Sequence, residues 1–359
     1  MTSSPVRLAD LVRIGMPALI EHYASKLTAH QRNALRSIAD CRTGAFGATA
    51  MLCSDCGHVQ ARMRSCGHRS CPQCQHPTTS AWLERQQAKL LPVEYFMATF
   101  TLPSCLRPIA YRSPTTVYPA FFAAMAATLK AFGLNHPKLH ADLGFCAVLH
   151  THSRRLEYHP HLHVVIPGGG IDTRERPMRL WRKLEGRYLF NGFALAEVFR
   201  AKCIDALRRA GVSLPAMLPQ KWVVHCEHVG QGLSALKYLS RYLYRGVISE
   251  RDLTDYDEKR QTVTFRYRNA KTHRFERRTL PIPEFLWHIA LHVLPKGLQR
   301  VRHYGFLHGN AKRLLSLVQR VLRFLTPEHR PRKPTPFRCS ACGAPMGIAS
   351  IPTASAPSG

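Results

Sequence analysis

The stretch EYHPHLHVVIPGGG, residues 157–170, places a histidine at every second position before an apolar run and three glycines. Alternation is the period of a β-strand, so His159, His161 and His163 are expected on one face, with the apolar residues between them facing a core. The run Gly168 to Gly170 is expected to end this strand in a turn. Neutral imidazoles that share a strand face are typical of a metal site, and the pair His161 and His163 carries this prediction.

Strand-like and helix-like runs surround this stretch. Residues 95–103 and 144–153 are rich in aromatic and β-branched residues and predict strands, whereas residues 118–132 and 196–210 predict helices. Only a few residues separate the strand at 144–153 from the histidine strand, which predicts a hairpin. Paired strands with helices between them favour an α+β domain with a central antiparallel sheet.

The composition indicates a polyanionic partner. The chain has 359 residues, and its 51 Lys and Arg against 22 Asp and Glu leave a formal net charge of +29. Nucleic acid and an anionic membrane surface would both attract such a chain. No apolar run approaches about 18 residues and no signal-peptide pattern is visible, so we expect a cytoplasmic protein that binds DNA and no membrane. In that compartment, 12 cysteines indicate metal ligands more than disulfides.

A cysteine-rich segment, residues 41–76, predicts a zinc site. Cys53 and Cys56 form one Cys-x-x-Cys pair and Cys71 and Cys74 form another, so we expect these four thiolates to share one tetrahedral zinc ion. Few long apolar residues lie between the two pairs. A metal ion is therefore expected to hold the segment together.

Further cysteines and histidines leave a second zinc site open. The candidate ligands near the first site are Cys41, His58, Cys66 and His68. Cys339 and Cys342 form a third knuckle, for which the sequence offers no evident second half. The remaining cysteines are isolated and are expected to be core residues; they are Cys105, Cys146, Cys203 and Cys226.

The segment SALKYLSRYLYRG, residues 234–246, predicts an amphipathic helix with two tyrosines on one face. Tyr238 and Tyr242 are four residues apart and so lie one helical turn from each other. Three cations surround them, namely Lys237, Arg241 and Arg245. Half-buried tyrosines are common on such helices. Beside a histidine pair and a basic chain, we interpret them as nucleophiles, because a tyrosine hydroxyl can attack a phosphodiester that a metal ion polarises. The cations would stabilise the phosphate charge.

In combination, these segments resemble the HUH superfamily of single-strand endonucleases. The closer resemblance is to the transposases of rolling-circle insertion sequences, the insertion-sequence-ninety-one-like family. It spans roughly residues 20–345 and rests on motifs in a fixed order, which are the cysteine-rich segment, FTLP, HPHLHVVIPGGG, WVVHCEHVGQG, KYLSRYLYRGVIS and HVLPKGLQRVRHYGFL.

The resemblance implies a DNA transposase. It implies Mg²⁺ or Mn²⁺ at His161 and His163, and Tyr238 and Tyr242 as nucleophiles that nick single-stranded element ends, form a 5′-phosphotyrosine and join the strand to a target. A single active tyrosine is the alternative. The superfamily also uses a third metal ligand, for which the candidates are Glu157, His150, His152 and His159.

The resemblance further implies structural Zn²⁺ bound by cysteines of the N-terminal segment. The matching positions are Cys53, Cys56, Cys71, Cys74, Cys41 and Cys66. One position departs from the family, because Ser70 stands where a histidine is frequent and His68 lies two residues earlier. The ligand set of a second zinc therefore stays open.

The expected domain organisation has four parts. They are a helical segment at 1–40, a zinc-binding domain at 41–80, an HUH endonuclease domain at 90–320 and a Pro-rich tail with a Cys-x-x-Cys knuckle at 326–359. Two other functions stay open. A plasmid replication initiator would use the same nicking chemistry on a different substrate. A zinc-ribbon DNA-binding regulator would need neither the histidine strand nor the paired tyrosines. A zinc hydrolase is less favoured, since no His-Glu-x-x-His spacing occurs.

Overall fold

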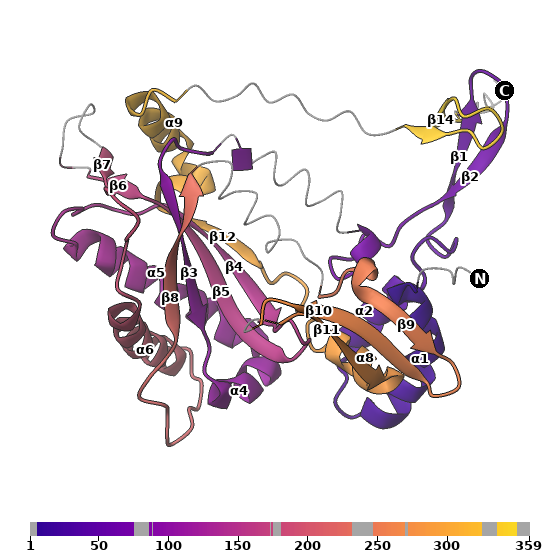
Figure 1. Ribbon diagram of the computed structural model, residues 1–359, viewed down its shortest axis with the longest axis horizontal. Coiled ribbons are helices and arrows are strands. Elements are labelled where there is room, and N and C mark those ends of the chain that lie inside the picture. Colours follow the sequence, from indigo (N-terminus) through magenta and orange to yellow (C-terminus); the bar gives the residue numbers. More distant parts are fainter. Residues whose placement is uncertain are drawn as a thin grey trace, which may run out of the picture.

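The computed structural model describes residues 6–74, 86–87, 89–172, 174, 181–231, 247–269, 272–324 and 336–349. Figure 1 shows a body built on a five-stranded sheet, a helical body with a three-stranded sheet, and a ribbon of short strands. Every pair of strands in the described residues is antiparallel. The predicted α+β class with antiparallel sheets is confirmed.

The histidine stretch is the middle strand of the five-stranded sheet. In spatial order the strands are β12 (Val301–Tyr304), β4 (Phe145–His152), β5 (Tyr158–Pro167), β3 (Glu94–Thr101) and β8 (Val224–Gln231). The hairpin of β4 and β5 forms as predicted. β4 is buried along almost its whole length and β3 along most of its length, which suits their aromatic and β-branched residues.

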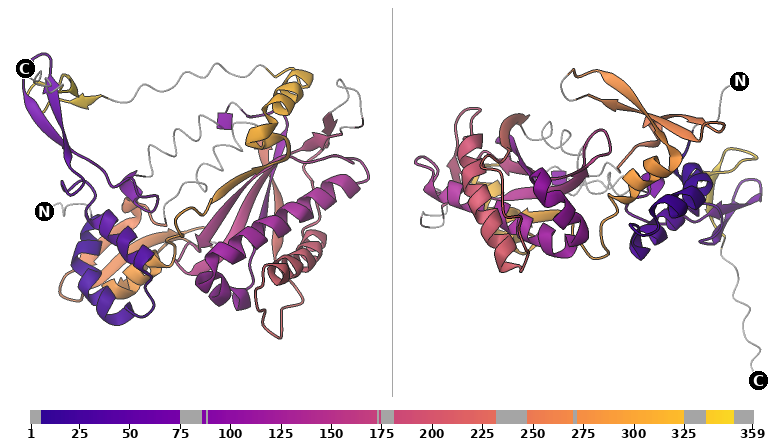
Figure 2. Two further views of the ribbon diagram at one scale, coloured as in Figure 1. Left: turned by 180° about the vertical axis from the view of Figure 1, so that it is seen from behind. Right: turned by 90° about the horizontal axis from the view of Figure 1, so that it is seen from below.

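Helices cover one face of this sheet. α5 (Pro114–Asn135) and α6 (Gly192–Arg209) pack against each other and enclose the main core, which includes Phe100 and Leu162 (Figure 2, left). α5 is long and apolar enough to cross a membrane by composition, but 56% of its apolar window is buried inside the structure, as in a core helix. The opposite face has a smaller core, to which α9 (Lys312–Val321) contributes.

The N-terminal helices pack against a part of the chain far away in sequence. α1 (Leu8–Tyr23) contacts α8 (Ile282–Ala290), and Gly15 permits the close approach because a Cβ there would lie 2.6 Å from Ile282. α2 (Ala29–Ala39) begins at a capping box formed by Thr28 and Gln31.

A three-stranded sheet completes the helical body. Its order is β11 (Phe275–Pro281), β10 (Thr262–Arg268) and β9 (Leu253–Asp257). One face of this sheet is buried in a second core together with residues of α1, α2 and α8. The predicted segment 1–40 and part of the predicted domain 90–320 therefore share one core.

The ribbon joins the two ends of the chain. β1 (Ala48–Cys53) pairs with β2 (Val59–Met63) on one side and with β14 (Pro345–Ile348) on the other. β13 (Phe337–Arg338) pairs with β14 and closes the sheet. The knuckle of the predicted tail thus lies in the same sheet as the first knuckle of the predicted zinc-binding domain.

The histidine strand ends at Pro167, directly before the glycine run as predicted, but the run continues into another strand and does not form the predicted turn. Gly169 and Gly170 belong to β6 (Gly169–Ile171), which pairs with β7 (Trp181–Lys183). The side chain of Trp181 lies against Gly169, so that a Cβ there would overlap the indole ring. The absence of a side chain at Gly169 therefore lets the indole ring of Trp181 pack directly against the backbone of β6.

The other elements are short. They are α4 (Arg107–Arg112) and the 3₁₀ turns η1 (Ser104–Leu106), η3 (Glu250–Asp252), η4 (Gly305–Leu307) and η5 (Gly309–Ala311).

Candidate functional site

Three imidazoles from two adjacent strands converge on the sheet face away from α5 and α6. His161 and His163 come from β5 and His150 from β4, and their ligand atoms all lie within 4.8 Å of one another. The antiparallel register explains the meeting, because His150 stands opposite His161 and Val148 opposite His163. The structure thus brings the predicted pair together with one of the four candidates for the third ligand. We call these three residues the histidine cluster.

The other three candidates lie outside the histidine cluster. The β4–β5 ladder shifts between His150 and His152, where a bulge on β5 breaks the simple alternation that would have aligned His159 with His161. His159 instead accepts a hydrogen bond at Nδ1 from Arg107, at 2.7 Å. His152 stacks on His150 with ring centroids 5.7 Å apart. Of the candidates for the third ligand, His159 and His152 thus stay outside the group of ligand atoms that meet.

The third unused candidate is Glu157 at the hairpin turn. Its carboxylate accepts a hydrogen bond from the hydroxyl of Ser153 at 3.3 Å and lies 3.9 Å from the guanidinium of Arg155. These local contacts assign Glu157 to the turn.

Burial keeps the histidine cluster neutral. It lowers the pKa of His161 to about 4 and of His163 to about 3, and it holds the pKa of His150 well below its ordinary value. At neutral pH these rings therefore carry free lone pairs. A neutral imidazole is the form that binds a metal ion.

Hydrogen bonds orient the rings. Nδ1 of His161 donates to the carbonyl of His159 at 2.7 Å, which leaves Nε2 as the unprotonated nitrogen. Nδ1 of His163 lies 3.1 Å from the hydroxyl of Thr99, which stands opposite it on β3. Such outer contacts fix the tautomer of metal-binding histidines.

The donor set fits a divalent cation. Nε2 of His161 and Nε2 of His163 face each other at 3.1 Å, and the nitrogen of His161 is unprotonated. Nε2 of His150 is buried without a hydrogen-bond partner in the described part of the chain. A cation among these nitrogens would satisfy all of them, and the remaining coordination positions would stay open to oxygen ligands.

The cysteines form two separate clusters. One, which we call the N-terminal cysteine cluster, consists of Cys41, Cys66, Cys71 and Cys74. The other, the joined cysteine cluster, consists of Cys53, Cys56, Cys339 and Cys342. The prediction that Cys53 and Cys56 share an ion with Cys71 and Cys74 is therefore wrong. Pairing of β1 with β14 brings the distant knuckle to the first one, so the nearest pair in sequence is not the partner.

Both cysteine clusters have the size that zinc requires. A tetrahedral ion with Zn–S bonds of about 2.3 Å separates its sulfurs by about 3.8 Å. Sγ of Cys41 lies 3.7 Å from Sγ of Cys74, and Sγ of Cys53 lies 3.5 Å from Sγ of Cys342. The thiol of Cys71 hydrogen-bonds Cys66 and lowers its pKa to about 5, so a thiolate is stabilised within the N-terminal cysteine cluster. The cysteine-rich segment is a Zn²⁺-binding segment.

The histidines proposed as alternative zinc ligands lie outside both clusters. Nε2 of His58 lies 3.3 Å from the hydroxyl of Ser340, and Nδ1 of His68 accepts from the backbone N–H of Ser70 at 3.1 Å. The four isolated cysteines are at least half-buried, as predicted for packing residues.

The predicted nucleophiles lie outside the described residues. This holds for both tyrosines and for the three cations around them, which are Tyr238, Tyr242, Lys237, Arg241 and Arg245.

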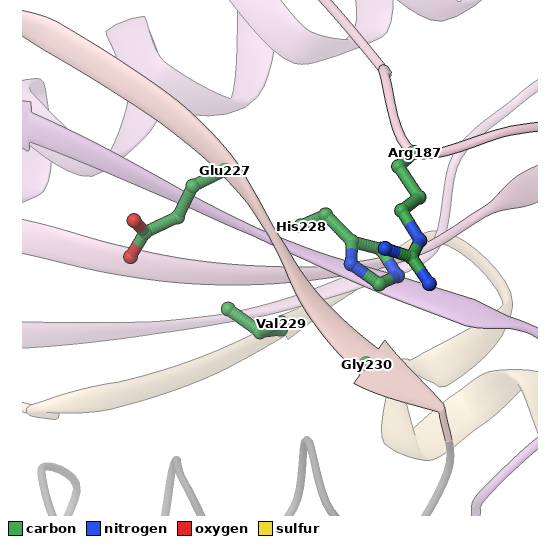
Figure 3. Close-up of a pocket in the computed structure, with 5 residues that line it drawn as sticks. All are labelled: Arg187, Glu227, His228, Val229 and Gly230. Carbon is green, nitrogen blue, oxygen red and sulfur yellow. The ribbon is translucent and has the colours of Figure 1, made fainter.

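The edge strand β8 adds polar groups near the histidine cluster. The register places His225 opposite Thr99 and Glu227 opposite Met97, so both side chains share the sheet face of His163. Figure 3 shows Glu227 on one side of β8 and His228 on the other. The sequence could have indicated that His225 and Glu227 share a face, because they alternate with apolar residues in the stretch VHCEHV.

A shallow pocket lies at the same edge. Its volume is about 420 Å³, and Arg187 and His228 are among the residues that line it (Figure 3). Glu94 accepts a hydrogen bond from Nε2 of His228 at 2.5 Å and another from the amide of Gln231 at 2.5 Å, and these bonds lower the pKa of Glu94. A carboxylate and an imidazole are thus paired at the rim.

Comparison with protein families gives two matches. Residues 144–314 match the family described as "Putative transposase", and residues 12–102 match the family described as "Transposase zinc-binding domain". The first match includes the histidine cluster. The second includes the N-terminal cysteine cluster and only one half of the joined cysteine cluster.

Two known sequences are similar along most of their length. "Putative transposase y4qJ" of Sinorhizobium fredii is 34% identical over 339 residues, covering 89% of this chain and 84% of the relative. The transposase for insertion sequence element IS801 of Pseudomonas savastanoi pv. phaseolicola is 28% identical over 341 residues, covering 85% and 80%.

Solved structures give only a distant likeness. A conjugative relaxase TrwC in complex with mutant OriT DNA aligns with a TM-score of 0.27 and 18% identity, covering 45% of this chain and 68% of the relaxase.

Proposed function

Because this chain belongs to the IS91-like transposases, we propose that it nicks and rejoins single DNA strands at the ends of an insertion sequence. The observation that carries the proposal is the histidine cluster, in which three neutral imidazoles aim unpartnered or mutually facing nitrogens at one point. The net charge of +29 supports DNA as the substrate. The proposed place of action is the cytoplasm.

In this proposal, His150, His161 and His163 hold Mg²⁺ or Mn²⁺. When bound, the cation polarises the scissile phosphate and neutralises part of its charge. Thr99 and the carbonyl of His159 keep the two β5 rings in the orientation that binding requires. Burial excludes the protonated rings at neutral pH, so the site needs no deprotonation before it can bind.

The proposed nucleophile is the hydroxyl of Tyr238. Its oxygen would form a bond to phosphorus while the bond from phosphorus to the 3′ oxygen breaks, leaving a 5′-phosphotyrosine and a free 3′-OH. The phenol proton would leave to solvent or to a nearby base, and the 3′ oxygen would take up a proton. Tyr242 would make the second attack, so that cleavage and joining occur in rolling-circle fashion at one site. Lys237, Arg241 and Arg245 would contact the phosphates.

A covalent-adduct assay tests this function. Single strands that cover both flanks of the gene would be labelled at the 3′ end and incubated with the full chain and Mn²⁺. We expect a labelled adduct that survives denaturation and disappears with chelator, with His161→Ala and with the double change Tyr238→Phe and Tyr242→Phe. Tyr188→Phe, at an exposed tyrosine on the same chain, should keep the adduct.

The outcomes separate the candidate functions. An adduct that persists in the double mutant would place the nucleophile elsewhere. Cleavage of a plasmid origin instead of element flanks would favour the replication initiator. A chain that binds DNA and never forms an adduct would be a regulator. The two transposase relatives favour the element ends.

A further inference from the structure

The outward face of the three-stranded sheet carries arginines and an exposed aromatic ring. Val263, Phe265 and Leu280 point into the core of the helical body. Their alternate neighbours therefore point outward, and the register sets Arg266 opposite Arg277 and Arg268 opposite Phe275. We call these four outward residues the arginine face. Figure 2 (right) shows the orange strands at the margin of the molecule, clear of the five-stranded sheet.

Phe275 is placed as a stacking platform. Its side chain is 68% exposed, which is unusual for a large aromatic residue in a strand. The guanidinium of Arg266 lies 5.4 Å from the centre of its ring. An aromatic ring with a cation beside it is the arrangement on which a nucleic-acid base stacks.

The charges on this face are incompletely balanced. Arg266 pairs with Asp252 at 3.1 Å, and Nε of Arg268 donates to the carbonyl of His273. Arg277 has no ion pair or side-chain hydrogen bond within the described ranges, and it stands directly opposite Arg266. Like charges opposite each other on paired strands are unfavourable, and an anion between them would remove that cost.

Two acidic residues of β9 share the outward side, in addition to Asp252, which pairs with Arg266. Asp255 of β9 stands opposite Thr264 of β10, and Asp257 of β9 stands opposite Thr262. Thr264 lies four residue pairs along the ladder from the pair of Arg268 and Phe275, and Thr262 lies six pairs from it. The face is thus basic and aromatic at the end that carries Phe275. The other end of the face carries both acidic and polar side chains.

We propose that the arginine face binds single-stranded DNA. A base would stack on Phe275 while Arg277, Arg266 and Arg268 hold the adjoining phosphates. Single strands fit better than a duplex, because stacking on an exposed ring needs an unpaired base. This surface lies on the opposite side of the three-stranded sheet from Tyr267 and Arg278, which contact the β4–β5 hairpin. It therefore holds a different stretch of the strand from the one at the histidine cluster.

The inference rests on the proposed function only in taking DNA as the substrate. The test uses the full chain, a fluorescent oligothymidylate and anisotropy over a series of salt concentrations. Phe275→Ala should weaken binding on the order of tenfold with little change in salt dependence, since stacking is not ionic. Arg277→Ala should lower the log–log salt slope by about 0.7, as expected when one phosphate of a single strand is no longer neutralised.

A matched control is available on α6. Phe193 is 86% exposed, so Phe193→Ala removes an equally exposed ring elsewhere and should leave binding unchanged. Phe275→Tyr keeps an aromatic surface and should restore affinity. An unaltered melting temperature in Phe275→Ala would show that the sheet still folds.

Two results would contradict the proposal that the arginine face binds single-stranded DNA. One is equal affinity of wild type and Phe275→Ala for the oligothymidylate. The other is an equal loss for duplex DNA, which would rule out stacking. Either result beside an intact covalent adduct would leave the nicking function standing. Conversely, single-strand binding that depends on Phe275 and Arg277, in a chain that forms no covalent adduct, would support DNA binding by the arginine face. It would contradict the proposed nicking function.

Discussion

At the scale of single residues, the orientation of the histidine cluster depends on hydrogen-bond partners that lie outside it. The carbonyl of His159 accepts a hydrogen bond from Nδ1 of His161, and the hydroxyl of Thr99 lies within hydrogen-bond distance of Nδ1 of His163. Sequence alone predicted His161 and His163 and left the third ligand among four residues. The meeting of His150 with this pair follows from the strand register, which is set by pairing between strands and not by local spacing.

The role of Thr99 can be measured. Thr99→Val keeps the shape and the strand preference but removes the hydroxyl next to Nδ1 of His163. We expect Mn²⁺ affinity to fall on the order of tenfold, because removing a hydrogen-bond partner of a ligand costs metal sites about that much. Thr101→Val is the control, since Thr101 stands opposite His161 on the same strand. Calorimetric titration with equal affinities for the two variants would contradict the role.

At the scale of elements, the tip of the β4–β5 hairpin fastens the five-stranded sheet to the helical body. Leu156 is 2% exposed within the core of the helical body, and its φ of 66° is rare for a leucine. His292, two residues beyond α8, donates from Nε2 to the carbonyl of Leu156 at 3.0 Å. Nδ1 of His292 accepts from the hydroxyl of Thr151 on β4 at 3.2 Å.

This contact predicts a loss of stability in mild acid. Burial lowers the pKa of His292 to about 4 from its ordinary 6.5, with His152, Tyr158 and His288 facing the ring. The unfolded chain therefore binds a proton that the folded chain refuses, and stability falls as the pH drops from about 6.5 towards 4. At full extent the loss is about 3 kcal/mol.

Urea unfolding across this pH range checks the prediction. His292→Asn removes the titrating ring, so its unfolding free energy should vary less with pH than that of the wild type. The difference between the two curves isolates His292 from the other buried histidines. Parallel curves would show that His292 is not the source.

Element prediction succeeded where burial alternates along a strand or follows a helical period. The hairpin, the strand at 95–103 and the helices at 118–132 and 196–210 are all present as β4–β5, β3, α5 and α6. The glycine run misled because glycine marks both turns and close packing. Only the indole of Trp181, which comes from a later strand, decides between the two.

At the scale of the whole molecule, packing partners are distant in sequence. α1 contacts α8, and the first Cys-x-x-Cys knuckle meets the last one. The sequence identified zinc, the α+β class and the family, because those follow from residue types and motif order. It misassigned the zinc ligands, because spacing says nothing about which of three knuckles will pair across a sheet.

Zinc content should reflect this arrangement. We expect two zinc ions per chain, and one when Cys339 and Cys342 are both changed to serine. Cys226→Ser, at a cysteine outside both clusters, should keep two. Elemental analysis of the purified full-length proteins decides the matter, and an unchanged content in the double variant would contradict the joined cysteine cluster.

A protease site inserted between residues 324 and 336 adds a second readout. After cleavage, the piece carrying Cys339 and Cys342 should stay bound to the rest of the wild-type chain and be released by a chelator. Release without chelator would mean that zinc does not hold the ribbon together.

The joined cysteine cluster also has a consequence for synthesis. Cys56 leaves the ribosome 283 residues before Cys339. At the usual rates of translation, this gap lasts roughly 15 to 60 s. During that interval Cys53 and Cys56 lack their two partners while the five-stranded sheet is being synthesised. The joined cysteine cluster can form only after Cys342 has been added to the chain. A product interrupted between β12 and Cys339 would carry the three histidines but only half of the joined cysteine cluster.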